Sequence, residues 1–100
     1  MKRGEIWVAG RAGNKRLVVI VGHDALTEQR DGVLVVPLSD VRASTIIEPT
    51  VSDEDGSAVG IAMVPRIGEI DKSYLVERQG RLSPESIEAL EIALRAVLDM

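Results

Sequence analysis

Two runs of β-branched residues, Leu17–Val21 and Val33–Leu38, constrain the fold of this chain most strongly. Each run is continuously apolar, which is typical of a strand with both faces covered by other parts of the protein. We therefore predict that Leu17–Val21 is the central strand of a sheet. Pro37 lies near the end of the second run, so we expect pairing to stop there or to lie at a sheet edge. The composition agrees, because 13 Val and 9 Ile accompany one Trp, one Tyr and no Phe.

Four weaker strand candidates are bounded by turn-forming residues. They are Arg3–Ala9, Ile46–Val51, Gly60–Val64 and Ile67–Ile70. Arg3–Ala9 alternates, with Ile6 and Val8 on its apolar side, as expected of a half-buried strand. Together with a C-terminal helix, these strands predict a mainly β (α+β) fold, a small antiparallel barrel or curled sheet with the helix packed on it. We expect residues 1–100 to form one domain, because 100 residues suffice for about one core.

The clearest single prediction is a helix from about Pro84 to Leu98. Ser83 is suited to cap its N-terminus, and Pro84 is suited to the first helical position. Five apolar residues fall within one arc of about 100° and predict the face that packs on the sheet. They are Ile87, Leu90, Leu94, Val97 and Leu98. Ile92 lies on the opposite side, where it is either a tolerated surface residue or a contact with a partner chain.

Charge is distributed unevenly along the sequence. The formal net charge is −4, which argues against a duplex-DNA binder with a basic surface all round. Residues 1–22 nevertheless carry a net charge of +4, residues 23–58 carry −6 and residues 59–100 carry −2. If the first loop folds onto one surface, Arg11, Lys15 and Arg16 form a compact positive site suited to a phosphodiester backbone or an acidic peptide. The alternative is a solvated loop.

Several classes of chemistry are excluded by what the sequence lacks. It has no cysteine, which rules out thiolate nucleophiles, disulfides and Cys-ligated zinc. The lone His23 is interpreted as a polar residue at a strand end, and the acidic run 53–55 as a solvated turn. What remains is metal-free chemistry in which an arginine stabilises negative charge and a hydroxyl assists. Arg16 and Ser39 flank the two central runs and suit these roles. The alternative is that Arg16 is only a charge at the start of a strand and Ser39 only a turn former beside Asp40.

Five stretches of the sequence, taken in order, resemble the MazF/PemK (Kid-like) toxins of bacterial toxin–antitoxin systems. They are Lys2–Trp7, Lys15–Val21, Val33–Ser39, Ile67–Lys72 and Gly80–Ser83. The resemblance implies an SH3-like barrel, a homodimer and a cytoplasmic, metal-independent endoribonuclease without a cofactor. Such an enzyme cleaves single-stranded RNA by letting the RNA's own 2′-OH attack the adjacent phosphate, so DNA is not a substrate. It also implies a cognate MazE-like antitoxin with a flexible acidic tail. No membrane partner is expected, because no apolar run approaches about 18 residues.

The resemblance also assigns roles to individual residues. Arg16 corresponds to the family's catalytic arginine, and Ser39 to its catalytic threonine. The expected RNA-binding residues are Arg11, Asn14, Lys15 and Arg66.

This chain departs from the family pattern at the site. Leu17 stands where the family has a proline after the arginine, and Ser39 replaces threonine. The first loop is short, and Pro65–Arg66 replaces the family's Glu-Gln. These changes predict an altered base preference or a reduced rate. The alternatives are a MazF-like module that titrates an antitoxin or holds RNA without cleaving it, and a toxin of the same fold that targets a protein such as DNA gyrase.

Overall fold

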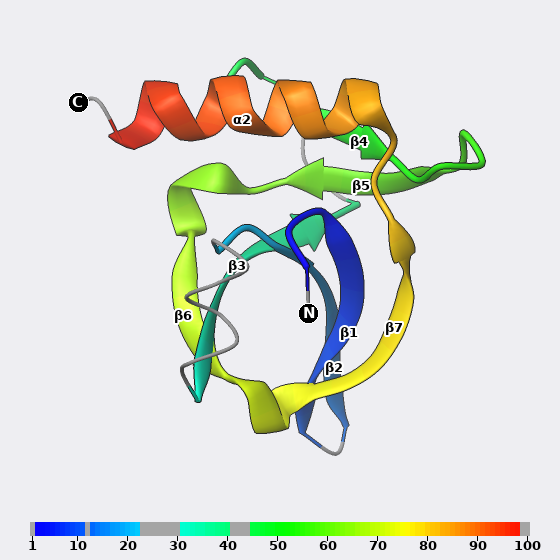
Figure 1. Ribbon diagram of the computed structural model, residues 1–100, viewed down its shortest axis with the longest axis vertical. Coiled ribbons are helices and arrows are strands. Elements are labelled where there is room, and N and C mark those ends of the chain that lie inside the picture. The colour runs from blue at the N-terminus through cyan, green and yellow to red at the C-terminus, as the bar shows by residue number, and fades with distance from the viewer. Residues whose placement is uncertain (1, 12, 23–30, 41–44, 99–100) are drawn as a thin grey trace.

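The computed structural model describes residues 2–11, 13–22, 31–40 and 45–98 (Figure 1). The strands within these ranges are β1 (Glu5–Arg11), β2 (Asn14–Ile20), β3 (Gly32–Ser39), β4 (Thr50–Ser52), β5 (Ala58–Ala62), β6 (Gly68–Asp71) and β7 (Leu75–Arg81). Two short 3-10 helices, η1 (Val64–Arg66) and η2 (Lys72–Tyr74), flank β6, and helix α2 (Pro84–Leu98) follows β7. No helix in these ranges has the length and hydropathy that a bilayer span requires.

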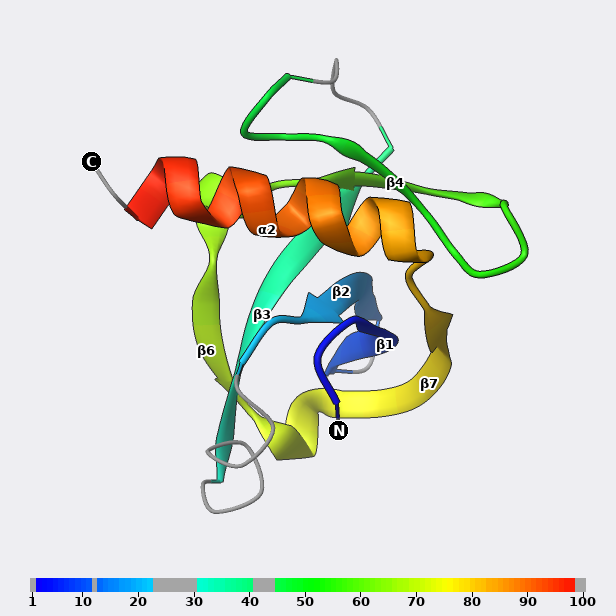
Figure 2. The same ribbon diagram turned by 45° about the horizontal axis from the view of Figure 1, so that its top comes forward.

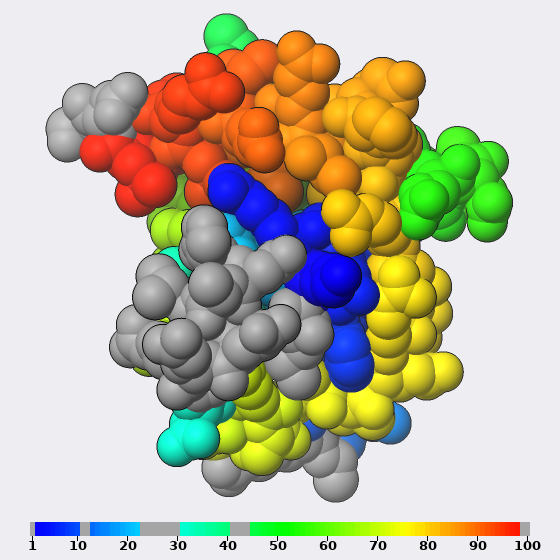
Figure 3. Space-filling view, in the orientation of Figure 1, coloured from blue at the N-terminus to red at the C-terminus, as the bar shows by residue number. Residues whose placement is uncertain are grey.

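All strand pairs are antiparallel, and the sheet curls into a half-barrel whose order is β4-β5-β3-β2-β1-β7. Strand β6 pairs with the first half of β3, outside this order. Helix α2 lies across one end of the half-barrel, next to β4 and β5 (Figures 1 and 2). Figure 3 shows the turn between β4 and β5 protruding beside the start of α2. The architecture confirms the predicted small antiparallel barrel with a C-terminal helix.

Strand β3 changes partners at Pro37. Its pairing with β2 ends at the Val18–Pro37 pair, and the next residues, Leu38 and Ser39, pair with β5 instead. Proline has no amide hydrogen to donate to a ladder, so one is favoured where a ladder ends. The prediction that pairing stops at Pro37 is right for the ladder with β2 and wrong for β3 as a whole, which continues into a second ladder.

The second half of β2 and the residue after it, Val21, are buried on both faces, as the uninterrupted apolar run predicts. Val19 and Val21 belong to the main core cluster, whereas Val18 and Ile20 belong to a second cluster on the other side of the sheet. Trp7, which the alternation in β1 places on the opposite side from Ile6 and Val8, packs against this second cluster. The curl of the sheet therefore encloses apolar side chains on its concave face as well as under the helix.

Helix α2 has the bounds that the sequence predicts, and Ser83 caps it. The Ser83 Oγ accepts a hydrogen bond from the Ser86 amide at 3.2 Å. Leu90 and Leu94 are buried in the main core, but Leu98, which was expected on the packed face, is 66% exposed because the last turn extends past the sheet. Ser86 is itself buried, and its Oγ accepts a hydrogen bond from the Ser52 amide of β4 at 2.8 Å.

Strand β7 was not predicted from the sequence. Its residues are mostly polar and exposed on both faces, so no hydrophobic alternation marks it. Its place is set by backbone pairing with β1, from Glu5–Arg81 to Ala9–Leu75, with two register shifts on the way. Two other predictions had the wrong bounds. Ile46–Val51 contributes only the start of β4. The strand predicted at Gly60–Val64 begins two residues earlier, at Ala58, and ends at Ala62, before the 3-10 turn that contains Pro65.

The carboxylate of Glu5 ties the N-terminal segment to β7. Glu5 Oε1 accepts hydrogen bonds from the Lys2 amide at 2.9 Å and from Trp7 Nε1 at 3.2 Å, and Oε2 pairs with Arg78 Nε at 3.0 Å. Partial burial acts to raise the pKa of Glu5. The two hydrogen bonds and the charge of Arg78 outweigh it, so the pKa lies below its ordinary value.

A carboxylate with a lowered pKa contributes stability that is complete above its unfolded-state pKa of about 4.3 and is lost as the pH falls through the folded value. We expect Glu5→Gln to lower the free energy of unfolding by about 1 kcal/mol at pH 7, and by less at pH 3. Urea denaturation at both pH values measures the difference. Glu54→Gln, at an exposed turn position, is the control. Equal losses at the two pH values for Glu5→Gln would contradict the expectation.

Candidate functional site

A tight hairpin between β1 and β2 places three polar side chains in succession. Gly10 pairs with Lys15, and its φ of +138° lies in a region that favours glycine. A Cβ at Gly10 would also overlap the carbonyl oxygen of Asn14. Only glycine therefore lets the chain turn here and start β2 with Asn14, Lys15 and Arg16, all of which are exposed.

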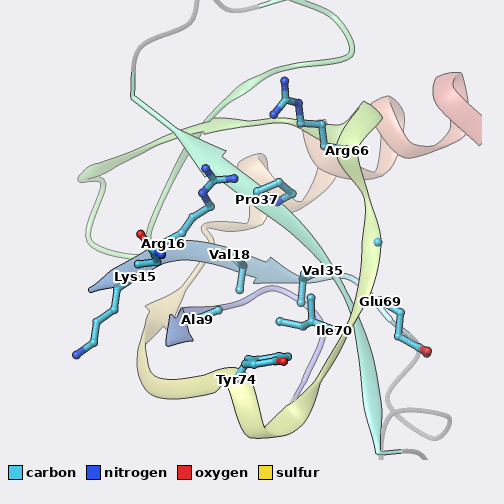
Figure 4. Close-up of a pocket in the computed structure, with 13 residues that line it drawn as sticks. Ala9, Lys15, Arg16, Val18, Val35, Pro37, Arg66, Glu69, Ile70 and Tyr74 are labelled. Carbon is cyan, nitrogen blue, oxygen red and sulfur yellow. The ribbon is translucent and has the colours of Figure 1, made fainter. Parts of the chain in front are cut away.

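These three residues line a cavity of about 570 Å³ on the concave face of the half-barrel (Figure 4). Arg66, at the end of η1, also lines this cavity, and Figure 4 shows its side chain extending away from the cavity floor. Figure 4 shows Arg16 and Arg66 at the rim on either side of Pro37, while Lys15 extends outward. The cavity thus has two guanidinium groups at its rim, a charge type that binds phosphate oxygens through bidentate hydrogen bonds.

Glu69 is the acidic residue among those that line this cavity, and it leaves the positive character of the rim intact. Figure 4 shows its carboxylate extending away from the two arginines. The side chain lies over Gly32 instead, since a Cβ at Gly32 would come within 2.8 Å of Glu69 Cδ.

Arg16 also lines a second, smaller cavity of about 300 Å³, and Ser39 lies in the wall of this one. The strand register explains why the two meet. Val18 pairs with Pro37, Arg16 lies two residues before Val18, and Ser39 lies two residues after Pro37. Residues two apart on a strand share a face, so the arginine and the serine project on the same side of neighbouring strands. Ser39 lines the smaller cavity and not the larger one, whereas Arg16 and Lys15 line both cavities.

Strand β5 fixes the backbone at Ser39 from the other side. Ser39 pairs with Ile61, and a Cβ at Gly60 would come within 2.9 Å of the Ser39 carbonyl oxygen. Glycine at this position, with a φ of +135°, lets β5 approach closely.

The structure brings most of the predicted site residues together. Asn14, Lys15, Arg16 and Arg66 share the larger cavity, and Arg16, Lys15 and Ser39 share the smaller one. The backbone of Arg11 ends β1 opposite Asn14, but its side chain lies outside what the structure describes. His23 is also outside the described residues.

The acidic run forms a turn. Asp53 Oδ1 accepts hydrogen bonds from the Asp55 and Ser57 amides, each at 3.0 Å. Within the described ranges, no three His, Asp or Glu side chains converge as a group that could hold a metal ion.

Sequence analysis assigned no site role to several residues of the larger cavity. Gly68, Ile70 and Tyr74 line its wall from β6 and η2. Gly68 and Ile70 lie in the stretch Ile67–Lys72 that resembles the family, but the resemblance gives neither a role, and no motif includes Tyr74. Only the pairing of β6 with β3 brings them opposite the arginines.

Comparison with known proteins assigns the chain to a family. Residues 2–98 match the family model described as the PemK-like, MazF-like toxin of type II toxin–antitoxin systems. The chain belongs to this family. The match spans both arginines of the rim and Ser39, so the two cavities lie within the PemK/MazF domain.

Solved structures share the fold over the whole chain. An endoribonuclease from Mycobacterial species, solved in complex with its cognate antitoxin, has a TM-score of 0.88 at 19% identity, covering 100% of this chain and 96% of that one. A MazE–MazF crystal structure from Deinococcus radiodurans has a TM-score of 0.84 at 15% identity, with coverage of 100% and 96%. At these identities the likeness establishes that this PemK/MazF chain has the fold of those toxins.

Proposed function

We propose that this chain is the toxin of a type II toxin–antitoxin system and acts in the cytoplasm as a metal-independent endoribonuclease on single-stranded RNA. The observation that carries the proposal is the position of Arg16, which lines the smaller cavity with Ser39 and the larger cavity with a second arginine. Membership of the PemK/MazF family supports it, as does the fold shared with an endoribonuclease.

In the proposed reaction the RNA supplies its own nucleophile. The 2′-oxygen forms a bond to the adjacent phosphorus as its proton leaves, and the bond from phosphorus to the 5′-oxygen breaks as that oxygen takes up a proton. The products are a 2′,3′-cyclic phosphate and a free 5′-OH. Arg16 neutralises the negative charge that develops on the phosphate oxygens, and the Ser39 hydroxyl donates a hydrogen bond to one of them.

The remaining cations hold the substrate. Lys15 and Arg66 contact neighbouring phosphates, which makes binding sensitive to salt, and Asn14 contributes donors and acceptors from the same strand end. Arg11 adds positive charge to the same hairpin. These four residues take no part in the bond changes of the proposed reaction. Their replacement should therefore weaken RNA binding and leave the rate of the chemical step unchanged.

A homodimer and a cognate antitoxin complete the proposal. Relatives with this fold were solved with their antitoxins, one of them as a MazE–MazF complex. An acidic antitoxin segment would complement the positive rim formed by Arg16 and Arg66 and would exclude RNA from both cavities.

Incubation of the pure protein with a long single-stranded RNA in EDTA tests the activity. We expect cleavage to proceed at the same rate with and without the chelator, because the proposed chemistry uses no metal. Products with 5′-OH ends, identified by their failure to ligate without prior phosphorylation, distinguish this route from hydrolysis by a metal-activated water. Cleavage abolished by EDTA would contradict the mechanism.

Intact RNA across many sequences, combined with retained binding, would point to the alternative module that holds RNA without cutting it. The feature that favours this alternative is Leu17, which gives the backbone after Arg16 more freedom than a proline would.

A further inference from the structure

The larger cavity has an apolar floor that phosphate binding does not require. Below the two arginines, Figure 4 shows the side chains of Ala9, Val18, Val35 and Ile70 converging with the ring of Tyr74. Tyr74 is the only tyrosine in the sequence. A flat, partly aromatic hollow next to cationic groups fits a ligand that joins a planar apolar group to a phosphate.

The hollow exists because β6 has a glycine at one position. Gly68 pairs directly with Val35, and Ile70, two residues further on, faces the cavity. Paired residues and residues two apart project to the same side of a sheet, so a side chain at position 68 would enter the cavity. A Cβ there would have only one neighbour within 4 Å, the Arg66 carbonyl oxygen at 4.0 Å. The fold therefore tolerates a side chain at this position, and the cavity would not.

The turn after β6 fixes the backbone from which the Tyr74 ring extends. Tyr74 ends the 3-10 helix η2, and Asp71 caps this helix by accepting a hydrogen bond from the Ser73 amide at 2.9 Å. The same hydrogen bonding keeps the pKa of Asp71 below its ordinary value. A capped single turn between two strands therefore sets the position of the Tyr74 backbone beside the hollow.

We propose that this hollow is a nucleobase site, in which a base next to the cleaved phosphate packs against the Tyr74 ring while Arg16 and Arg66 hold its phosphates. The inference rests on the RNA binding that is part of the proposed function. It adds the part of the RNA that this cavity recognises, which is a base. Contact between a base and an aromatic ring tolerates any base but depends on its presence. Tyr74 and the empty position at Gly68 then determine how well a base is held and which bases fit.

The test uses a 2′-O-methyl RNA oligonucleotide, which cannot be cleaved by the proposed route, and an oligonucleotide of the same length with abasic units. We expect Tyr74→Ala to weaken binding of the base-bearing oligonucleotide by about 5- to 100-fold and to leave binding of the abasic one unchanged. Tyr74→Phe keeps the ring and should bind the base-bearing oligonucleotide as the unaltered protein does. Fluorescence anisotropy of labelled oligonucleotides gives each affinity.

Gly68→Leu tests the same site by filling it. We expect it to lose affinity for the base-bearing oligonucleotide and to unfold at the same temperature as the unaltered protein. Ala58→Leu adds the same side chain at an exposed position of β5 and should change neither property. If Gly68→Leu does not fold, the affinities of Tyr74→Ala and Tyr74→Phe for the base-bearing oligonucleotide show whether the hollow binds a base.

The two proposals fail separately. The nucleobase site is overturned if Tyr74→Ala loses the same affinity for base-bearing and abasic oligonucleotides, or loses affinity for neither. This holds even when the protein cleaves RNA. Base-dependent binding that requires Tyr74, without cleavage of any natural RNA, overturns the ribonuclease and leaves the nucleobase site standing. Absence of RNA binding by the unaltered protein overturns both.

Discussion

Replacing Arg16 by alanine is expected to lower the rate of RNA cleavage by about 10²–10³-fold, the loss typical of removing one donor that stabilises transition-state charge. Arg16 is exposed at the start of β2 and lines both cavities. Its side chain is no part of either core cluster, so the free energy of unfolding should change by less than about 0.5 kcal/mol. Single-turnover cleavage with excess enzyme measures the chemical step, and thermal unfolding checks the fold.

Two further variants show whether the effect belongs to the guanidinium. Arg16→Lys keeps the charge and loses the planar pair of donors, so it should recover only part of the rate. Arg95→Ala removes an exposed arginine from α2, which lines neither cavity, and should cleave normally. Cleavage by Arg16→Ala at the rate of the unaltered protein would remove the arginine from the mechanism.

Replacing Leu90 by alanine is expected to have the largest effect on stability, a loss of about 2–5 kcal/mol. Leu90 is 1% exposed and lies in the main core cluster between α2 and the sheet. Domains of this size have a total stability of about 5–15 kcal/mol, so the loss is a large fraction of the whole. Urea denaturation gives the free energy of unfolding of each protein.

Ile92→Ala is the matched control for Leu90→Ala. Ile92 lies on the same helix but is 50% exposed, so its truncation should cost less than about 0.5 kcal/mol in the monomer. A much larger loss that depends on protein concentration would instead assign Ile92 to a contact between chains. Comparable losses for the two variants at low concentration would contradict the packing described for α2.

Short-range sequence patterns were enough to predict the strand and the helix that contribute buried side chains to the core. The run Leu17–Val21 predicted a doubly buried strand, and Ser83 with the following apolar spacing predicted α2, because burial and capping act within a few residues. Strand β7 could not be predicted, since its residues bury little and its place depends on the backbone of β1, far away in the sequence. Leu98 was placed wrongly for a similar reason: periodicity defines a face but does not say where the sheet beneath it ends.

The residues of the candidate site were also only partly predictable from the sequence. Arg16 and Ser39 were identified because each follows or precedes a recognisable strand, and the register of two such strands then brings them to one face. Tyr74 and Gly68 were missed because what distinguishes them is three-dimensional. Gly68 leaves space in the cavity because it has no side chain opposite Val35, and Tyr74 contributes its ring to the wall of the same cavity. Neither property leaves a trace in the spacing of residues.

The pairing of β1 with β7 delays completion of the molecule during synthesis. Glu5 and its partner Arg78 are 73 positions apart, and the helix that covers the main core is made later still. A nascent chain that has already exposed Arg16 and Ser39 to the cell lacks the strand beside β1 and the lid over its apolar interior. The segment that carries the candidate site therefore cannot reach its final packing until the residues of β7 and α2 have also been made.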